Sequence, residues 1–529
     1  MPQEINYPIG IQTFEQIIEG DYVYVDKTEL IHKLATTNKC VFLSRPRRFG
    51  KSLLVSTLEA YFQGRKALFK GLAIETLEKE WKAYPVLRFD LSGENYDCPE
   101  KLIEKISLTL SHYEDIYGEN PKAKSIAARF ASLLANAEKQ TTQKVVILID
   151  EYDKPLTDTL HNDPLREDLR NELAAFYGVM KGKDDAIRFV LLTGITKFGH
   201  VSVFSGLNNL IDISLDEDYN AICGVSETEF RKYFPESVKS LAKEYNASEE
   251  DMWNALRIHY DGYHFSKSKE GIYNPFSLMV SFKRRKLGFF WFTSGTPWFL
   301  VNTLNCYGFP LSSLEGEWFT EEELLDITDP EHNYQALFFQ AGYLTIKGYQ
   351  PGQIVPFVKL EKFQLGFPNE EVRYGFWNTL YDKYLFRHHP RSIFNQPEFI
   401  KAVETGNPQE FMERLQSLLA ELSHGNTPKD NVRLKEINFQ NDLQIIFRML
   451  GFEVHTEITT ASGRIDMTVE TPSFVYLFEF KTDSTPESAL KQIKDNGYAL
   501  KFKADPRRVF LIGANFDPTT NSLDSFLIE

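Results

Sequence analysis

Continuous apolar runs alternate with amphipathic segments over the first 215 residues. Four runs predict strands that are buried on both faces: 40–43, 84–89, 145–149 and 187–192. Between them, apolar residues recur at spacings of three, four, seven and eight, as at Leu54, Leu58, Tyr61 and Phe62, which is typical of helices. Residues 22–25 and 210–214 are expected to form two further short strands. Strands that alternate with helices indicate a parallel α/β sheet covered on both faces.

Beyond residue 216 the pattern becomes mostly helical and then changes twice. A helix containing Leu337 and ending at Gly342, strand 343–346, a Gly/Pro-rich turn at 348–356 and more strand-like residues predict a small winged-helix-like module. A helix at 411–422 and a polar linker at 423–430 follow. The last hundred residues predict helix 436–450 and strands 453–458 and 474–478, which is an α/β pattern again.

The first candidate chemistry lies where strand 40–43 ends and Gly50-Lys51-Ser52 opens a helix. A strand, a loop and Gly-Lys-Ser at a helix start form a phosphate-binding loop, whose N–H groups surround phosphates. Lys51 then reaches the β- and γ-phosphates, and the Ser52 hydroxyl ligates Mg²⁺. Arg45 stands where this motif has glycine, so a different entry into the turn is expected. The residues expected to contact ATP here are Arg47, Arg48, Phe49, Gly50, Lys51 and Ser52.

A second half of an ATPase site follows about 100 residues later. The apolar strand 145–149 runs into Asp150-Glu151 at its carboxyl end, where ligands of such sheets bind. Asp150 is expected to hold Mg²⁺, and Glu151 to orient and deprotonate the attacking water. The strand 187–192 ends in Thr193 and Thr196, either of which could contact the γ-phosphate, and both could equally be capping residues.

A second constellation lies near the C-terminus. Asp466 is followed about a dozen residues later by Glu479-Phe480-Lys481 at the end of an apolar strand. Alternation along a strand places Glu479 and Lys481 on one side. Two carboxylates that bind Mg²⁺ or Mn²⁺, with a lysine that positions or activates water, are suited to cleaving a phosphodiester.

The segment Arg45–Ser52, preceded by Tyr24–Thr28, resembles the bacterial AAA-ATPase-like family, in which an arginine-rich loop is usual. Members of that family often carry a C-terminal PD-(D/E)xK nuclease-like domain, and the resemblance covers nearly the whole chain. It implies that 260–265 and 273–276 lie in a helical lid. It also implies that Glu436 is an extra acidic ligand on the preceding helix, and that Gln492 and Tyr498 are the usual glutamine and tyrosine of the nuclease.

Together these features predict four domains and an α/β fold class. An AAA-like P-loop ATPase core spans 1–215, a helical lid 216–330, a winged-helix-like and helical connector 331–422, and a PD-(D/E)xK nuclease-like domain 431–529. A chain of 529 residues is too long for a single core, and its 42% hydrophobic content suffices for several.

Charge and cysteine content limit both the binding partners and the cellular compartment that the sequence favours. The net charge of −15 excludes a general polyanion binder, so any contact with nucleic acid must come from a local patch. Three interpretations of the basic run 283–286 stay open. It forms such a patch, it supplies an arginine that contacts nucleotide, or it is a solvated helix face, which is the commonest case. Four scattered cysteines, and no apolar run of about 18 residues, favour a cytoplasmic protein without disulfides, zinc or membrane contact.

Two functions of different classes are compatible with this sequence. The first is an ATP-hydrolysing switch coupled to a metal-dependent nuclease acting on DNA or RNA, which the complete set of Asp466, Glu479 and Lys481 favours. The second is a signalling ATPase whose nuclease-like domain only docks a partner, which the acidic charge favours. Self-association of the chain stays open in both cases.

Overall fold

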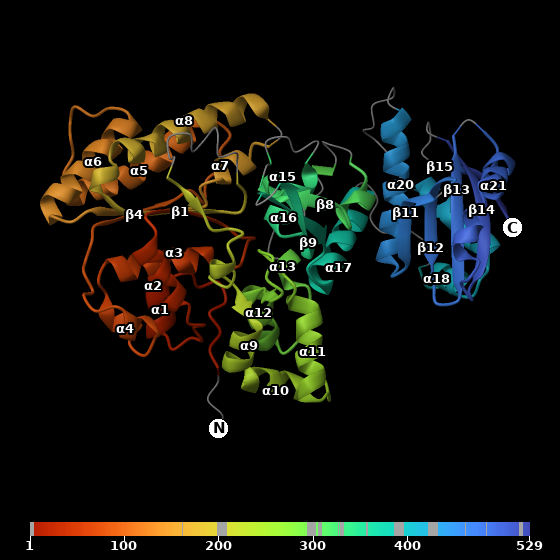
Figure 1. Ribbon diagram of the computed structural model, residues 1–529, viewed down its shortest axis with the longest axis horizontal. Helices are drawn as coiled ribbons and strands as arrows, with labels where there is room; N and C mark the ends of the chain where they lie inside the picture. Colours follow the sequence, from red (N-terminus) through yellow and green to blue (C-terminus); the bar gives the residue numbers. More distant parts are fainter. Residues whose placement is uncertain are drawn as a thin grey trace. The chain divides into compact units, whose positions relative to one another are not determined.

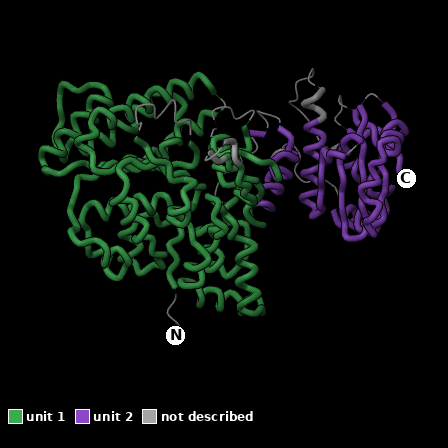
Figure 2. The backbone as a smooth tube through the Cα atoms, viewed as in Figure 1, with its two compact units in different colours: residues 1–293, 316–372 green, residues 294–315, 373–529 purple. Residues whose placement is uncertain are grey.

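The computed structural model describes residues 5–160, 162–197, 209–293, 303–304, 309–325, 327, 333–355, 358–385, 396–421, 432–460, 462–482, 484–517 and 522–529. Within these, the side chains of 353–359, 383–384, 421 and 432–436 are not described. The chain forms two compact units, drawn in different colours in Figure 2. The first contains residues 1–293 and 316–372, and the second contains residues 294–315 and 373–529.

The first unit is built on a five-stranded parallel sheet with the order β2-β3-β4-β1-β5. Its strands are β1 (Cys40–Ser44), β2 (Val86–Asp90), β3 (Val145–Asp150), β4 (Ile187–Gly194) and β5 (Ile211–Asp212). All residues of β1 and β3 are buried, as continuous apolar runs predict for strands covered on both faces. The predicted parallel α/β fold class is confirmed.

Helices cover both faces of this sheet (Figure 1). They are α1 (Phe14–Glu19), α2 (Thr28–Thr37), α3 (Lys51–Phe62), α4 (Ile74–Leu77), α5 (Pro99–Tyr117), α6 (Ile126–Thr141), α7 (Lys154–Thr157) and α8 (Asp163–Gly182). Helices α5, α6 and α8 lie on one side, with α1 to α4 on the other. The prediction of a strand at 22–25 was wrong. Val23 donates only to Asn6 O, at 2.9 Å, and the segment joins no sheet.

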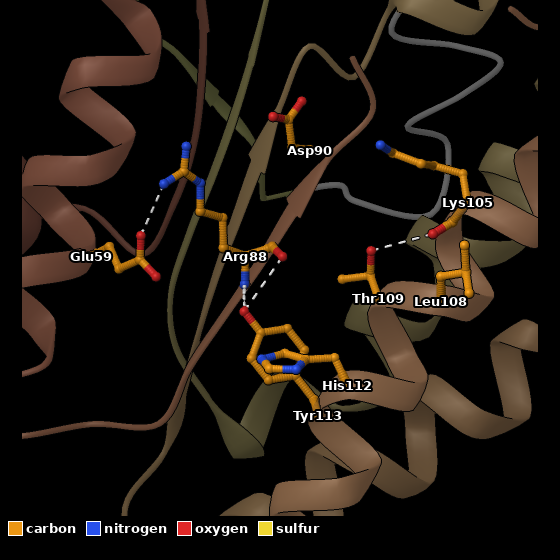
Figure 3. Close-up of a pocket in the computed structure, with 8 residues that line it drawn as sticks. All are labelled: Glu59, Arg88, Asp90, Lys105, Leu108, Thr109, His112 and Tyr113. Atoms are coloured by element: carbon orange, nitrogen blue, oxygen red, sulfur yellow. Dashed lines mark hydrogen bonds and ion pairs between the residues drawn. The ribbon is translucent and has the colours of Figure 1, made fainter. Parts of the chain in front are cut away.

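Strand β2 is an edge of the sheet, and side chains of α3 and α5 cover it (Figure 3). The Tyr113 hydroxyl of α5 accepts a hydrogen bond from the Arg88 N–H at 2.8 Å and donates to the Arg88 carbonyl at 3.5 Å. The Arg88 guanidinium pairs with Glu59 of α3 at 3.0 Å. A free strand edge invites pairing with other chains, and Tyr113 satisfies its outward groups at Arg88.

A mostly helical segment follows in the first unit, as predicted for the lid. Its elements are β6 (Val225–Ser226), α9 (Glu227–Tyr233), α10 (Pro235–Glu244), α11 (Glu249–Tyr260), β7 (Ile272–Tyr273), α12 (Pro275–Arg284) and α13 (Phe290–Thr293). Phe230, Phe234 and Phe282 are central to its aromatic core. The basic run 283–286 is exposed at the end of α12, and Arg285 there pairs with Glu244 at 3.2 Å.

The first unit ends in a small antiparallel sheet, β8-β10-β9, with two short helices. The elements are β8 (Trp318–Thr320), α15 (Glu321–Leu325), α16 (Tyr334–Ala341), β9 (Thr345–Val355) and β10 (Val358–Gly366). The predicted turn at 348–356 was wrong, because β9 continues to Val355. β9 is an edge strand, and an edge accepts Pro351, which has no N–H to donate.

A buried carboxyl joins the lid to this part of the unit. Glu371, at the start of α17 (Glu370–Leu380), is 0% exposed, and its Oε1 accepts from Trp291 N and Ser277 Oγ, both at 2.8 Å. Its Oε2 is buried with no hydrogen-bond partner in the described residues. Burial raises the pKa of the Glu371 carboxyl from 4.5 to about 7. The folded chain therefore holds this proton more tightly than the unfolded chain does.

Stability is expected to fall as pH rises from about 4.5 to 7, because unfolding releases that proton. Glu371→Gln keeps the acceptor oxygen and removes the titration. It should flatten this slope and stabilise the first unit at pH 8 by up to about 3 kcal/mol. Thermal unfolding at pH 5 and pH 8 measures the difference, with exposed Glu370→Gln as the matched control. Equal slopes in wild type and Glu371→Gln would contradict the assignment.

The second unit contains a five-stranded mixed sheet, β11-β12-β13-β14-β15. Its strands are β11 (Glu453–Thr460), β12 (Gly463–Glu470), β13 (Phe474–Lys481), β14 (Arg508–Asp517) and β15 (Ser522–Ile528). All neighbours are antiparallel except β13 and β14, which are parallel and connected through α21 (Pro486–Asp495). Other helices of this unit are α18 (Gln396–Glu404), α19 (Pro408–Glu421) and α20 (Val432–Met449).

Each face of this sheet carries its own apolar core. Phe411 of α19 and Phe447 of α20 pack on Phe478 of β13, with ring centroids 6.1 and 6.4 Å away. On the other face, Leu490 and Ile493 of α21 belong to a cluster with Val475 and Leu477, among others. The helix predicted at 411–422 as part of a connector therefore contributes to the core of the second unit.

The borders predicted at 215, 330 and 422 stay predictions, since the two compact units divide the chain at other residues. The linker predicted at 423–430 lies outside the described residues. Among the helices that the structure describes, none combines the length and the apolar character that a bilayer crossing requires.

Candidate nucleotide site and candidate nuclease site

The loop between β1 and α3 turns at its second half. Arg48 and Gly50 have φ of +66° and +98°, so the left-handed conformations fall there and not at Arg45. The Arg45 guanidinium is 1% exposed and donates to the carbonyls of Ser44 and Ser214 at 2.9 and 2.8 Å. It also lies over the Phe265 ring, 4.2 Å from the centroid. Arg45 therefore fixes the base of the loop to its surroundings, which explains how arginine replaces the usual glycine.

Lys51, the first residue of α3, points back into the loop. Its Nζ donates to the carbonyls of Arg45 and Pro46 at 2.9 and 3.2 Å. Burial lowers the pKa of Lys51, and the carboxylates of Asp150, Glu151 and Asp153 oppose that shift. The charges of these three acidic groups act on the buried Lys51 ammonium. The loop and the end of β3 therefore belong to a single site. Lys51 and Ser52 are the first two residues of α3.

The acidic pair at the end of β3 lies in two different environments. Asp150 is 1% exposed and accepts from Thr193 Oγ1 at 2.7 Å and from Glu151 N at 3.1 Å. Glu151 is half-buried and adopts φ of +51°, which is uncommon for a residue other than glycine. Burial raises the pKa of Glu151, against the opposing charge of Lys51. Such strained backbone is frequent at functional sites, where surrounding contacts hold it.

Asp153 is a site residue that the sequence reasoning missed. It is 2% exposed, and its Oδ2 accepts from Thr196 N at 2.7 Å, from Thr196 Oγ1 at 2.6 Å and from Ile195 N at 3.0 Å. A Cβ at Gly194 would collide with this carboxylate, so glycine is required. The only available signal was its place three residues after Asp150. The two threonines are thereby distinguished: Thr193 bonds to Asp150, and Thr196 to Asp153.

A small apolar cavity lies beside the loop. It has a volume of about 80 Å³, and Val25 of the N-terminal segment, Gly50 and Leu53 of the loop and α3, and Cys223 and Met279 of the lid line it. Phe49, whose ring lies 4.7 Å from that of Tyr263, also lines this cavity.

The lid and the small sheet module also contact the loop and the end of β4. Trp291 Nε1 donates to the Arg47 carbonyl at 3.1 Å, and Arg48 lies over the Phe276 ring at 4.8 Å. Gln340 of α16 accepts from Lys197 N at 2.7 Å, one residue beyond Thr196. A change of conformation at the phosphate loop or at Thr196 would therefore alter contacts with the lid and with α16.

The four groups predicted near the C-terminus come together in the second unit. Lys481 Nζ donates to Glu479 Oε1 at 3.0 Å and to Gln492 Oε1 at 2.5 Å. Asp466 of β12 accepts from Phe480 N at 2.7 Å through its Oδ2, which brings it to the same end of β13. The Tyr498 hydroxyl accepts from Asn496 at 2.9 Å, and its ring is buried in the core beneath α21. The side chain of Glu436 lies outside the described residues.

Two carboxyls lie close together in this site, with Glu479 buried and Asp466 half-buried. Burial, and then the charge of Glu479, raise the pKa of Asp466 from 3.8 to about 7. Burial also raises the pKa of Glu479, which Lys481 opposes. Glu479 is 2% exposed, and its Oε2 has no hydrogen-bond partner in the described part of the chain. A buried carboxylate oxygen without a partner is costly unless a cation binds it.

Two family models match the chain, one over each of these two regions. The family described as "Predicted AAA-ATPase" matches residues 8–204, and the "PD-(D/E)XK nuclease superfamily" matches residues 434–526. A relative from Azotobacter chroococcum mcd 1, named "Uncharacterized protein in vnfD 5'region", is 36% identical over 526 residues, covering 99% of this chain and 98% of its own. The chain belongs to the AAA-ATPase-like family and ends in a PD-(D/E)XK nuclease-superfamily domain.

For this family member, the predicted resemblance is confirmed over both matched regions. A solved structure of the Aeropyrum pernix ORC2 protein, in ADPNP and ADP complexes, aligns with 72% of this chain and 97% of its own, at 10% identity. Its TM-score of 0.23 is too low to support any inference. The AAA-ATPase-like region contains the phosphate loop and the Asp150 end of β3. The nuclease-superfamily region contains Asp466, Glu479, Lys481 and Gln492.

The side chains of both sites fit the groups that the families imply. At the nuclease-like site, the unpartnered Glu479 Oε2 beside Asp466 offers hard oxygen ligands of the kind that Mg²⁺ and Mn²⁺ prefer. At the loop, Lys51 offers an ammonium that donates to two backbone carbonyls, those of Arg45 and Pro46. As they stand, no three His, Cys, Asp or Glu side chains of the described residues converge tightly enough to hold a metal ion. Water ligands would complete a site with two carboxylates.

Proposed function

We propose that this AAA-ATPase-like protein hydrolyses ATP and uses its C-terminal domain as a Mg²⁺- or Mn²⁺-dependent nuclease on DNA or RNA. The observation that carries the proposal is the grouping of Asp466, Glu479, Lys481 and Gln492 around one buried, unpartnered carboxylate oxygen. A domain kept only for docking has no need to place a half-buried carboxyl beside a buried one, because desolvation of both costs free energy in the absence of a cation.

In the nucleotide half, each proposed role follows from a contact. Lys51 would exchange its bonds to the carbonyls of Arg45 and Pro46 for the β- and γ-phosphates. Ser52 and Asp150 would hold Mg²⁺, which neutralises charge on the phosphates. Thr193 orients Asp150 through its 2.7 Å hydrogen bond, and Thr196 lies with Asp153 beside them. Glu151 would take the proton of the attacking water.

Glu151→Gln is expected to keep ATP binding and to lower turnover about 10²-fold or more, because only the proton-accepting carboxylate is lost. Asp150 and Lys51 remain in place to bind the nucleotide. Steady-state hydrolysis and equilibrium ATP binding, both measured on the purified chain, separate the effect on turnover from the effect on binding. Glu167→Gln, on the exposed surface of α8, is the matched control and should behave like wild type. Unchanged turnover in Glu151→Gln would rule out Glu151 as the base.

In the nuclease half, Asp466 and Glu479 would share the divalent cation, which polarises the scissile phosphate. Lys481 is held between Glu479 Oε1 and Gln492 Oε1, so its ammonium has a fixed position beside the Glu479 carboxyl. In that position it can orient the attacking water or stabilise the charge that develops on the phosphate. Gln492 thus acts as a positioning residue that holds Lys481.

Incubation of supercoiled plasmid with the full chain and Mn²⁺ or Mg²⁺, with and without ATP, tests the function. Metal-dependent nicking or linearisation that EDTA stops is the expected result. A single-stranded RNA substrate in parallel assays separates DNA from RNA. Absence of cleavage of every substrate, by chain that still hydrolyses ATP, would contradict the nuclease half alone.

The second candidate is a signalling ATPase whose nuclease-superfamily domain docks a partner. The contacts of Trp291 with the Arg47 carbonyl and of Gln340 with Lys197 favour it, because they connect the nucleotide loop to the lid and to α16. A nucleotide-dependent change of partner binding, with no cleavage in any metal, is the result that would select this function.

A further inference from the structure

Aromatic side chains of the lid contact two arginines of the phosphate loop. The Arg47 carbonyl accepts a hydrogen bond from Trp291 Nε1 at 3.1 Å, and the Arg48 guanidinium lies over the Phe276 ring, 4.8 Å from its centroid. Arg48 has a φ of +66°, a conformation that residues other than glycine adopt rarely and that surrounding contacts must stabilise. The lid therefore takes part in fixing the shape of the loop.

One buried carboxyl binds the segments that carry both of these aromatic residues. Glu371 Oε1 accepts from the backbone N–H of Trp291 and from the hydroxyl of Ser277, both at 2.8 Å. Ser277 directly follows Phe276 in α12, and Trp291 belongs to α13. A single oxygen atom of Glu371 thus connects the two helices whose side chains contact the arginines.

The next residue of the loop contacts a third lid residue that lies near the same carboxyl. The Phe49 ring lies 4.7 Å from the ring of Tyr263. Burial raises the pKa of the Tyr263 hydroxyl well above its ordinary value, and the charge of Glu371 adds to that shift. Residues 47, 48 and 49 therefore each contact a part of the lid that Glu371 binds or adjoins.

The position of Arg47 affects the carboxylate that is proposed to activate water. Burial raises the pKa of Glu151, and the charges of Lys51 and Arg47 oppose that shift. A loop released from the lid would adopt several conformations, and only some of them would present the arginines to nucleotide. Apparent affinity for a ligand falls in proportion to the fraction of the chain in the binding-competent conformation.

We propose that Glu371 positions the arginines of the phosphate loop for ATP, acting through its bonds to Trp291 and Ser277. Glu371 is buried in the first unit, so its effect on ATP passes through these two lid residues. The inference rests on the proposed ATP-hydrolysing function. It adds a residue that belongs to neither the loop motif nor the acidic end of β3.

Trp291→Phe tests the bond to the loop, because it keeps most of the aromatic surface and removes the Nε1–H donor. Loss of one hydrogen bond should weaken binding of ATP with Mg²⁺ about fivefold, measured as the Kd of the full chain. Turnover at saturating ATP should fall less, since bound ATP selects the competent loop. Trp318→Phe on β8, 39% exposed, is the matched control and should bind like wild type. An unchanged Kd in Trp291→Phe would overturn the inference.

Two substitutions of Glu371 separate its acceptor oxygen from its charge. Glu371→Gln keeps an acceptor for Trp291 and Ser277 and should bind ATP like wild type. Glu371→Leu fills the buried space without an acceptor and should weaken ATP binding at least about tenfold, because two hydrogen bonds are lost together. Wild-type affinity in Glu371→Leu, or equal weakening in Glu371→Gln and Glu371→Leu, would contradict positioning through these bonds.

A double variant tests whether Glu371 acts through Trp291. Adding Trp291→Phe to Glu371→Leu should weaken ATP binding by less than Trp291→Phe does alone, because the indole is already released, whereas additive effects would overturn the connection. Thermal unfolding without ATP shows which variants are folded at the assay temperature. If Glu371→Leu does not fold, Ser277→Ala, which removes only one hydroxyl, takes its place. Wild-type affinity in Ser277→Ala would then overturn the inference.

Lys51→Ala separates failure of this inference from failure of the proposed function. Wild-type affinity in Trp291→Phe and Glu371→Leu, with ATP binding lost in Lys51→Ala, would overturn the role of Glu371 and leave the proposed function standing. ATP binding that Lys51→Ala retains in full would place the nucleotide site elsewhere and overturn both.

Discussion

Replacing Asp466 by asparagine is expected to abolish plasmid cleavage, with a loss of at least about 10³-fold, and to remove Mn²⁺ binding from the second unit. Asparagine still accepts the 2.7 Å hydrogen bond from Phe480 N, so the change removes charge and little else. A cation with few protein ligands depends on each charged oxygen, and the loss of several kcal/mol of transition-state stabilisation gives a factor of this size. Cleavage rate and Mn²⁺ calorimetry on the same preparation measure both effects.

The raised pKa of Asp466 provides a control for this prediction. Because burial raises the pKa of Asp466 to about 7, its ionised form is unfavourable in the folded chain. Without metal, Asp466→Asn should therefore melt at the same temperature as wild type or higher, which separates lost chemistry from lost folding. Asp495→Asn, exposed on α21, should cleave normally. Cleavage that persists in Asp466→Asn, or Mn²⁺ binding equal to that of wild type, would exclude this site.

Lys51→Ala is expected to reduce ATP hydrolysis about 10³-fold and to remove most of the affinity for ATP. The Lys51 ammonium is predicted to reach the β- and γ-phosphates, and fixed positive groups on a transferring phosphoryl group have effects of this order. The variant also relieves a buried charge whose pKa burial lowers, so the unbound chain should not be destabilised for electrostatic reasons. Equilibrium binding of ATP and steady-state hydrolysis are the measurements.

Lys39→Ala is the matched control, because Lys39 immediately precedes β1, at the opposite end from the loop, and pairs with Asp184 at 2.7 Å. It should hydrolyse ATP like wild type. Wild-type turnover by Lys51→Ala would place the nucleotide site elsewhere. The same variant tests coupling, since a change of plasmid cleavage in Lys51→Ala would show that nucleotide controls the nuclease-like domain.

Strand and loop positions in the first unit were predictable because the signals are local. A run such as 145–149 is apolar throughout, and only a strand covered on both faces buries every residue of it. Gly50-Lys51-Ser52 at a helix start and Asp150 at a strand end are each defined by neighbours in sequence. The cluster of Asp466, Glu479, Lys481 and Gln492 was predictable for a similar reason, since alternation and one crossover helix bring them together.

Where a prediction from the sequence was wrong, the elements packed beside the segment had decided its conformation. Gly348 and Pro351 suggested a turn, but β9 is an edge strand that needs no N–H from proline on its outer side. Residues 22–25 have the composition of a strand, but they lie against the cavity beside the loop and pair with no sheet. Neither outcome depends on local propensity, and both depend on which partner lies alongside.

The sequence by itself determined the parallel α/β sheet, the phosphate loop and the acidic groups that end two strands, because each rests on contacts between residues near in sequence. Tertiary structure alone decided that Asp153 binds Thr196 across two strand ends, and that Arg45 anchors the loop to Ser214 and Phe265. It also decided that Glu457 of β11 accepts a hydrogen bond from Gln440 of α20, since the packing of the helix against the sheet determines which side chains meet. The sequence around a carboxylate does not indicate which residue of another element will bind it.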